Sequence, residues 1–245
     1  MYGFPRTAVR QPIARRPQYN FDPRAYGTLE WWVNAVQSPS IPTDSPPAIT
    51  SLRDLSGNGR NLSPFTTTPG YLIADGWAGW PALSLGQAAY TGGMPPITGA
   101  AARTMVAVVC PTFQDSVYRT MLSFGSSAAN TTVGLGTRQT SNALSLFTNN
   151  VELSSATAAL LLTRPGVYGM TYDGTTVRLY VDGSLIQTTT VAINTGSGVL
   201  GLGYRTGSGD FLGGFLTWDA MIWSGAISGA AMATMAAELR AMYRF

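Results

Sequence analysis

Gly166–Thr190 reads GVYGMTYDGTTVRLYVDGSLIQTTT, and this stretch decides the fold. Large side chains occupy every second position from Tyr168 to Tyr172 and again from Val177 to Val181. A period of two is typical of strands with one buried face. Asp-Gly pairs at 173–174 and 182–183 separate the three runs, and they favour tight turns because glycine accepts a positive φ at little cost. The stretch therefore predicts a three-stranded antiparallel meander.

Further short strands are predicted on both sides of this meander. They are apolar or alternating runs bounded by Gly, Asn, Pro or Ser. The predicted strands are Tyr26–Val36, Arg103–Thr112, Tyr118–Phe124, Thr131–Thr137, Ala143–Phe147, Gly198–Tyr204 and Phe215–Trp223. A chain of 245 residues with 28 Gly and 15 Pro suits one all-β domain of many strands and tight turns. The pattern predicts an antiparallel β-sandwich.

One helix is predicted, over residues 228–243 at the C-terminus. Its apolar residues share one face and are Met232, Met235, Leu239 and Met242. Ser228 and Ser224 are the candidate N-caps, since a serine hydroxyl can accept from the first unpaired backbone N–H groups of a helix. We expect the apolar face to pack on the sandwich; a partner-binding helix is the alternative.

Residues 1–25 differ in composition from the rest. They hold four prolines and five arginines against one acid, a net charge of +4, whereas residues 26–245 carry ten arginines and eleven acids, a net of −1. The arginines are Arg6, Arg10, Arg15, Arg16 and Arg24. Dense proline disfavours helix and sheet, so we predict an extended arm, 1–25, that anchors one domain, 26–245, to an acidic partner. A disordered tail is the alternative, and the nearly neutral body argues against nucleic-acid binding.

Two tryptophans are the candidate ligand platform. Trp77 and Trp80 flank an Ala-Gly pair, and sugars bind to exposed aromatic faces with polar groups nearby. The alternative is that these rings fill the core. Trp218 and Trp223 lie an odd number of positions apart on one predicted strand, so we expect them on opposite faces.

Calcium is the candidate cofactor. Asp54, Asn58 and Asp210 are candidate ligands, because calcium takes six to eight oxygen atoms. The alternative is that Asp54 and Asn58 bond to the backbone of a tight turn. The chain has no His, no Lys and one Cys, which argues against a Ser-His-Asp triad, an imidazole metal site, a Schiff base and a thiolate zinc cluster.

Four segments, in order along the chain, resemble laminin-G-like domains of the concanavalin A-like lectin/glucanase superfamily. Leu52–Leu62, LRDLSGNGRNL, is similar to the family's D-x-S-G-N-G opening, and Gly79–Leu85 to its G-x-P-A-L-x-F stretch. Tyr172–Gly183 resembles its most recognisable hairpin, and Phe211–Ile227 its closing strand. The resemblance covers about residues 28–243 and implies a jelly-roll sandwich of two curved antiparallel sheets.

The same resemblance raises the question of glycan cleavage. Enzymes of the superfamily carry clustered acids of the form Glu-x-Asp-x-(x)-Glu, and retaining hydrolysis requires two carboxylates about 5 Å apart. Glu30, Glu152 and Glu238 begin no such cluster, and the closing strand has Asp219 where the family often has a Glu. We therefore expect a protein that is not an enzyme.

The expected setting is a bacteriophage particle. The N-terminus lacks the apolar core of a secretory signal, and no apolar run approaches the ~20 residues of a membrane span. The resemblance implies a virion structural protein made in the host cytoplasm, either a capsid decoration protein or a tail-fibre component. We expect a homo-oligomer, such as a trimer, whose arm contacts other capsid or tail proteins. The alternative is a carbohydrate-binding module that recognises host-surface glycans; a glycoside hydrolase ranks last.

Overall fold

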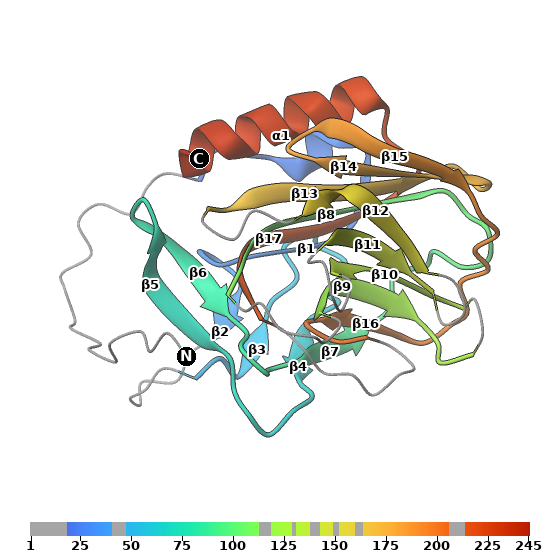
Figure 1. The fold of residues 1–245 in the computed structure, drawn as a ribbon. Helices are drawn as coiled ribbons and strands as arrows, with labels where there is room; N and C mark the ends of the chain where they lie inside the picture. Colours follow the sequence, from blue (N-terminus) through green and yellow to red (C-terminus); the bar gives the residue numbers. More distant parts are fainter. Residues whose placement is uncertain are drawn as a thin grey trace.

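The computed structural model describes residues 19–40, 48–112, 119–128, 131–137, 143–148, 152–159, 164–205 and 214–245. In these residues the strands form two antiparallel sheets that face each other, with one helix on the outside (Figure 1). The predicted all-β sandwich with a C-terminal helix is therefore confirmed.

Sheet A lies under the helix. It consists of β1 (Thr28–Asn34), β5 (Tyr71–Trp77), β6 (Trp80–Ser84), β8 (Arg103–Pro111), β13 (Gly166–Tyr172), β14 (Thr176–Val181), β15 (Ser184–Thr190) and β17 (Phe215–Ser224). Its strand order is β15-β14-β13-β8-β17-β6-β5, and β1 pairs with β17 off this path. Strands that are distant in sequence are neighbours, as in a jelly roll.

Sheet B closes the other side of the core. It consists of β2 (Pro39–Ser40), β3 (Ser51–Leu52), β4 (Leu62–Pro64), β7 (Tyr90–Gly93), β9 (Arg119–Gly125), β10 (Thr132–Thr137), β11 (Ala143–Phe147), β12 (Glu152–Ala159) and β16 (Val199–Leu202). Its strand order is β12-β11-β10-β9-β16-β7-β4-β3-β2.

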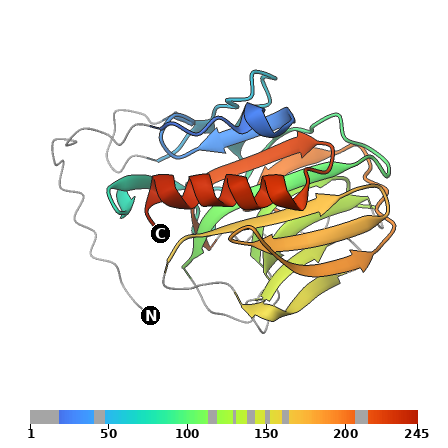
Figure 2. The same cartoon turned by 90° about the horizontal axis from the view of Figure 1, so that it is seen from above.

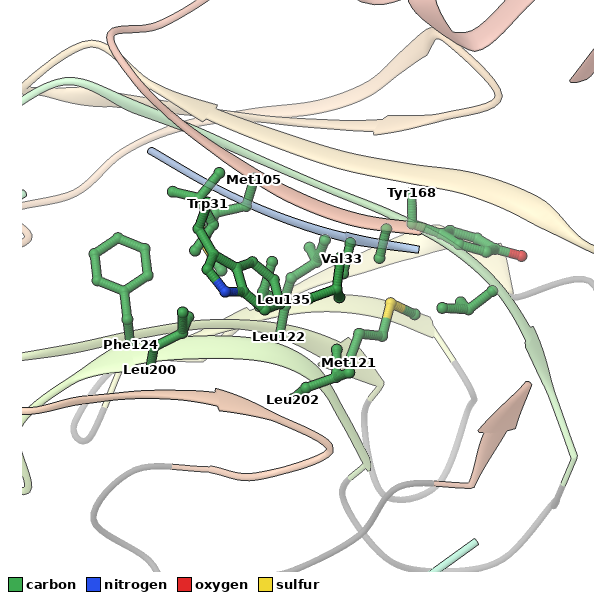
Figure 3. Packing of buried hydrophobic residues seen from close by; sticks show 14 of the residues in the cluster. Trp31, Val33, Met105, Met121, Leu122, Phe124, Leu135, Tyr168, Leu200 and Leu202 are labelled. Carbon is green, nitrogen blue, oxygen red and sulfur yellow. The ribbon is translucent and has the colours of Figure 1, made fainter. Parts of the chain in front are cut away.

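The main core lies between the two sheets. Trp31, Met105 and Tyr168 of sheet A pack against side chains such as Leu122 and Leu200 of sheet B, and all five are fully buried (Figure 3). Burial of each large apolar side chain stabilises the fold by roughly 1.5–3 kcal/mol. This alternation of inward side chains is the pattern that the sequence predicts.

The predicted meander is confirmed as β13, β14 and β15. Asp182 and Gly183 form the turn between β14 and β15, with φ angles of 51° and 83°. Two positive φ angles define the type I′ turn that suits the twist of a hairpin. A Cβ on Gly183 would also lie 2.9 Å from Cα of Ala233 in the helix, so this turn requires glycine twice over.

The helix α1 (Gly229–Tyr243) lies along the outer face of sheet A (Figure 2). The Ser228 hydroxyl accepts from the Ala231 N–H at 3.1 Å, which confirms the predicted N-cap. The buried stripe includes Met232, Met235 and Leu239, as predicted, but continues through Tyr243 rather than Met242. No helix in the described ranges combines the length and the apolarity that a membrane span needs.

A second apolar cluster lies between sheet A and the helix. Trp32, Trp80, Trp218 and Trp223 belong to it together with the buried face of α1. The expectation that Trp218 and Trp223 lie on opposite faces is therefore wrong. The β17 register shifts between Thr217 and Asp219, and this bulge turns Trp218 to the same face as Trp223.

Candidate functional site

The two residues of the predicted platform lie in one hairpin but in different environments. Trp77 ends β5, Trp80 begins β6, and the two residues pair across a turn made by Ala78 and Gly79. Trp77 is half-buried, whereas Trp80 is only 3% exposed and packs edge-on against Tyr243. An exposed platform of both rings is therefore wrong, because β6 directs Trp80 into the second apolar cluster.

The predicted calcium ligands that the structure describes hold a loop against β1. Asp54 Oδ1 accepts from the N–H groups of Trp32 and Ser56, and Oδ2 accepts from the Arg60 N–H and the Ser56 hydroxyl. Asn58 Nδ2 donates to main-chain carbonyls of β1. These bonds match the turn alternative. The described residues contain no group of three or more His, Cys, Asp or Glu that could hold a metal, and Asp210 lies outside them.

The predicted boundary at residue 25 is wrong, because residues of the stretch 19–25 pack on the body. Of the five anchoring arginines, Arg24 donates to Leu55 O at 2.6 Å and lies over the Trp32 ring, so it contacts the body. Arg6, Arg10, Arg15 and Arg16 lie outside the described residues. Phe21 is 7% exposed, which places the boundary of the body before Tyr19 instead of after residue 25. We call residues 19–25 the entry segment.

A buried carboxylate lies where this entry segment, sheet A and the helix meet. Asp219 is fully buried and accepts hydrogen bonds from Tyr19 Oη at 2.8 Å, Trp32 Nε1 at 3.0 Å and Tyr243 Oη at 2.5 Å. Asp219 faces the second apolar cluster by the regular alternation that also directs Met221 and Trp223 there, and the bulge before it brings Trp218 to the same face. We call Tyr19, Trp32, Asp219 and Tyr243 the Asp219 cluster.

Burial decides the protonation chemistry of this cluster. Loss of hydration raises the pKa of Asp219 to about 7, although its three hydrogen bonds act in the opposite direction. Burial, together with the nearby Asp219 charge, also raises the pKa of Tyr19 and of Tyr243 well above the ordinary phenol value. The carboxyl group therefore changes charge near neutral pH, and the two phenols remain protonated donors.

An open hollow adjoins the cluster at the end of the helix. It has a volume of about 590 Å³. Its lining residues come from the entry segment, β6 and α1 and are Asn20, Phe21, Trp80, Glu238, Ala241, Met242 and Arg244. Aromatic rings beside an amide, a carboxylate and a guanidinium are the lining expected for a small polar ligand with an apolar face. Figure 2 shows the C-terminal end of α1, and the lining residues Glu238, Ala241 and Met242 belong to this end of the helix.

The other fully buried charge, Arg103, serves the fold. Its guanidinium donates to Ala101 O and Gly99 O, each at 2.8 Å, and to the Thr195 hydroxyl. Burial lowers the pKa of Arg103 to about 10, so the group stays charged at neutral pH. These contacts tie the loop before β8 to the loop before β16 and leave the guanidinium no access to a ligand.

Two antiparallel sheets that face each other define a β-sandwich. Similar solved structures include a domain of an arabinanase, an arabinofuranosidase and a toxin binding domain. Domain 4 of AbnA, a GH43 extracellular arabinanase from Geobacillus stearothermophilus in complex with arabinotriose, is 15% identical with a TM-score of 0.62; the match covers 86% of this chain and 99% of that chain. A GH54 α-L-arabinofuranosidase soaked with a cyclic sulfate inhibitor is 14% identical with a TM-score of 0.65, over 89% of this chain and 60% of that one. The botulinum neurotoxin serotype G binding domain is 10% identical with a TM-score of 0.60; the match covers 86% of this chain and 51% of that chain.

This chain therefore spans only part of the arabinofuranosidase and toxin chains, but almost all of the arabinotriose-bound domain. No family model matches the sequence, and no curated protein matches it. At these identities the likeness establishes the fold alone. It confirms the β-sandwich part of the sequence resemblance, and the laminin-G-like and virion parts stay predictions.

No pattern in the sequence predicts the Asp219 cluster. Tyr19 and Tyr243 lie at opposite ends of the chain, and no local pattern joins them to Trp32. A weak indication was present, since Asp219 is the one acid in the apolar closing strand. A charged residue within such a strand has either a solvent-facing position or buried partners.

Proposed function

We propose that the protein is a non-enzymatic carbohydrate-recognition module. The observation that carries this proposal is the hollow at the end of α1, where aromatic rings lie beside Asn20, Glu238 and Arg244. The β-sandwich fold, shared with a domain solved in complex with arabinotriose, supports the same ligand class. Among the described residues, the hydrogen-bond partners of Asp219 are phenols and an indole, so they offer no second carboxylate for glycosidic hydrolysis.

The test is a glycan array followed by titration calorimetry on the full chain. We expect binding to a neutral glycan, and we expect Arg244→Ala to weaken it by roughly 10- to 100-fold, because a charge-assisted hydrogen bond contributes roughly 1.5–3 kcal/mol. Arg178→Ala is the matched control, since Arg178 is an exposed arginine of β14 that pairs with Asp173. An array without a bound glycan would reject the proposal, and cleavage of a bound glycan would reject its non-enzymatic part.

A second proposal concerns the particle to which the protein would belong, and it rests on the arginine-rich N-terminal residues. We propose that residues 1–18, with their four arginines, attach the sandwich to a bacteriophage particle as a decoration or tail-fibre component. The boundary before Tyr19 supports a body that stays folded without the arm. Deletion of residues 1–18 is expected to abolish incorporation into particles while the circular dichroism of the body stays unchanged. Normal incorporation of the truncated protein would contradict attachment through the arm.

A further inference from the structure

We propose that the entry segment is a removable cover over a saccharide site, in which the Tyr19 side chain takes the place of a sugar ring. The site lies on the outer face of sheet A, between β1, β6, β17 and the end of α1. The inference deepens the proposed glycan recognition and rests on it. It names where the ligand binds and what competes with it.

Tyr19 has the two features by which a neutral sugar is recognised. Its ring lies 5.7 Å from the Trp32 ring at an interplanar angle of 35°, and 6.4 Å from the edge-on Trp80 ring. Its hydroxyl donates to Asp219 Oδ1 at 2.8 Å. A sugar ring likewise packs its apolar face on an indole and donates a hydroxyl hydrogen to a carboxylate. The side chain thus indicates the chemistry that the site accepts.

The lining of the site offers more polar groups than Tyr19 satisfies. Asn34 is fully buried and lies opposite Asp219 in the pairing of β1 with β17, so both side chains share one face. Trp218 Nε1 is a buried donor without a hydrogen-bond partner among the described residues; Asn34 Nδ2 makes no hydrogen bond of normal geometry there either, although the Asn34 amide is close enough to the Tyr19 hydroxyl to act against the rise of its pKa. Buried donors are almost always paired, because an unpaired one costs about 1–3 kcal/mol. A saccharide brings several hydroxyl oxygens, whereas tyrosine brings one that already donates to Asp219.

The entry segment is attached in a way that permits release. Three bonds join it to the body: Tyr19 Oη to Asp219, Arg24 Nη2 to Leu55 O, and Trp223 Nε1 to Pro23 O at 2.9 Å. The Ala25 N–H donates to Asp22 O within the segment itself. Among the described residues, no backbone–backbone hydrogen bond joins the segment to a strand of either sheet. Lifting the segment therefore breaks side-chain contacts and leaves the sheets intact.

The hollow gives a ligand access to the covered site. Asn20 and Phe21 of the entry segment form one side of the hollow, and Glu238 and Arg244 of the helix end belong to the other. Trp80 lines the hollow and also contacts Tyr19, so one indole joins the open and the covered parts. A saccharide bound in the hollow needs only to displace Tyr19 to reach Asp219.

The experiment compares the affinity of full-length variants for arabinotriose and for neutral trisaccharides of xylose, glucose and galactose by titration calorimetry. We expect Tyr19→Ala to bind about 10-fold more tightly than the natural chain, since the internal competitor is gone. Tyr19→Phe, which keeps the ring and loses the hydroxyl, should fall between the two. Adding Asp219→Asn to Tyr19→Ala should remove the gain. Tyr71→Ala is the matched control, because Tyr71 is an exposed tyrosine of β5 outside the cluster and the hollow.

Thermal unfolding with p-cresol checks that Tyr19→Ala keeps a formed cavity, because this compound is the missing side chain. Stabilisation of Tyr19→Ala by p-cresol without tighter sugar binding would overturn the inference, since the cavity would then accept only an apolar ring. If the natural chain binds a glycan and Tyr19→Ala or Tyr19→Phe binds it equally well, glycan recognition stands and this site is wrong. If no variant binds any saccharide, both proposals are rejected. If Tyr19→Ala alone binds, the covered site is supported and recognition by the resting chain is rejected.

Discussion

A carboxyl group that is buried among neutral donors, as Asp219 is, takes up a proton more readily than the same group in water. Its partners are Tyr19, Trp32 and Tyr243, and all three remain uncharged near neutral pH. The pKa of Asp219 is raised to about 7 by burial, against an ordinary value near 4 in the unfolded chain. The folded protein therefore binds this proton more tightly than the unfolded chain does.

Stability should consequently fall as the pH rises between about 4 and 7. For Asp219 alone, the free energy of unfolding should be about 2–3 kcal/mol larger at pH 5 than at pH 8. Asp219→Asn should lose this component, so the difference between variant and natural chain should change with pH. Guanidinium unfolding of both proteins at pH 5, 6, 7 and 8 measures this difference in the free energy of unfolding. Parallel pH curves for the two proteins would contradict the raised pKa.

The pKa of Asp173 is shifted in the opposite direction to that of Asp219, so the two contributions to the pH dependence of stability must be distinguished. Hydrogen bonds from Arg178 and from the N–H groups of Thr175 and Thr176 lower the pKa of Asp173. Its contribution is present at neutral pH and is lost as the pH falls through this lowered pKa, below the range in which Asp219 titrates. Asp173→Asn should therefore leave the slope between pH 5 and 8 unchanged.

Among the elements, those set by local chemistry could be predicted from the sequence. The two Asp-Gly turns, the Ser228 cap and the period of two in Gly166–Thr190 each act within a few residues. The sequence does not predict the hairpin of β5 and β6, because its register shifts between Ile73 and Trp77 and its alternation is broken. The bulge in β17 likewise has no local sequence pattern, and it decides to which face Trp218 points.

The turn before β15 provides the test at this scale. Gly183→Ala should destabilise the fold by roughly 2–3 kcal/mol, because the position has a positive φ and the new Cβ meets the helix backbone at Ala233. Gly79→Ala is the matched control, with a φ of 82° and nothing within 4 Å of a Cβ. Its cost should be about 1 kcal/mol. Equal losses in urea unfolding would show that the helix does not constrain the turn.

For the whole molecule, the arm that composition predicts ends too late in the sequence. Arginine and proline continue to Arg24, so the charge count alone sets the boundary at residue 25. The structure adds what composition cannot show, namely that Tyr19 and Phe21 have partners in β1, β6 and β17. The candidate site arises from the same long-range contacts, which is why the sequence predicts the fold better than the site.

Two truncations should therefore behave differently. Deletion of residues 1–18 keeps the entry segment and should leave the melting temperature within about 2 °C of the natural chain. Deletion of residues 1–25 removes the buried Phe21 and the Tyr19–Asp219 bond. That loss of roughly 4 kcal/mol should lower the melting temperature by roughly 8–16 °C. Differential scanning calorimetry measures both, and equal melting temperatures would place the boundary back at residue 25.

The way the entry segment is held also decides how the protein responds to tension. A force applied to the chain before Tyr19 would act first on the hydrogen bond between Tyr19 and Asp219. It would then act on the hydrogen bonds of Pro23 and Arg24 in sequence, so the contacts would break one at a time. Seven released residues extend by at most about 25 Å before the force reaches the ladder between β1 and β17. If residues 1–18 attach the protein to a partner, as proposed, release of the entry segment would lengthen that attachment under load before the sheets are strained.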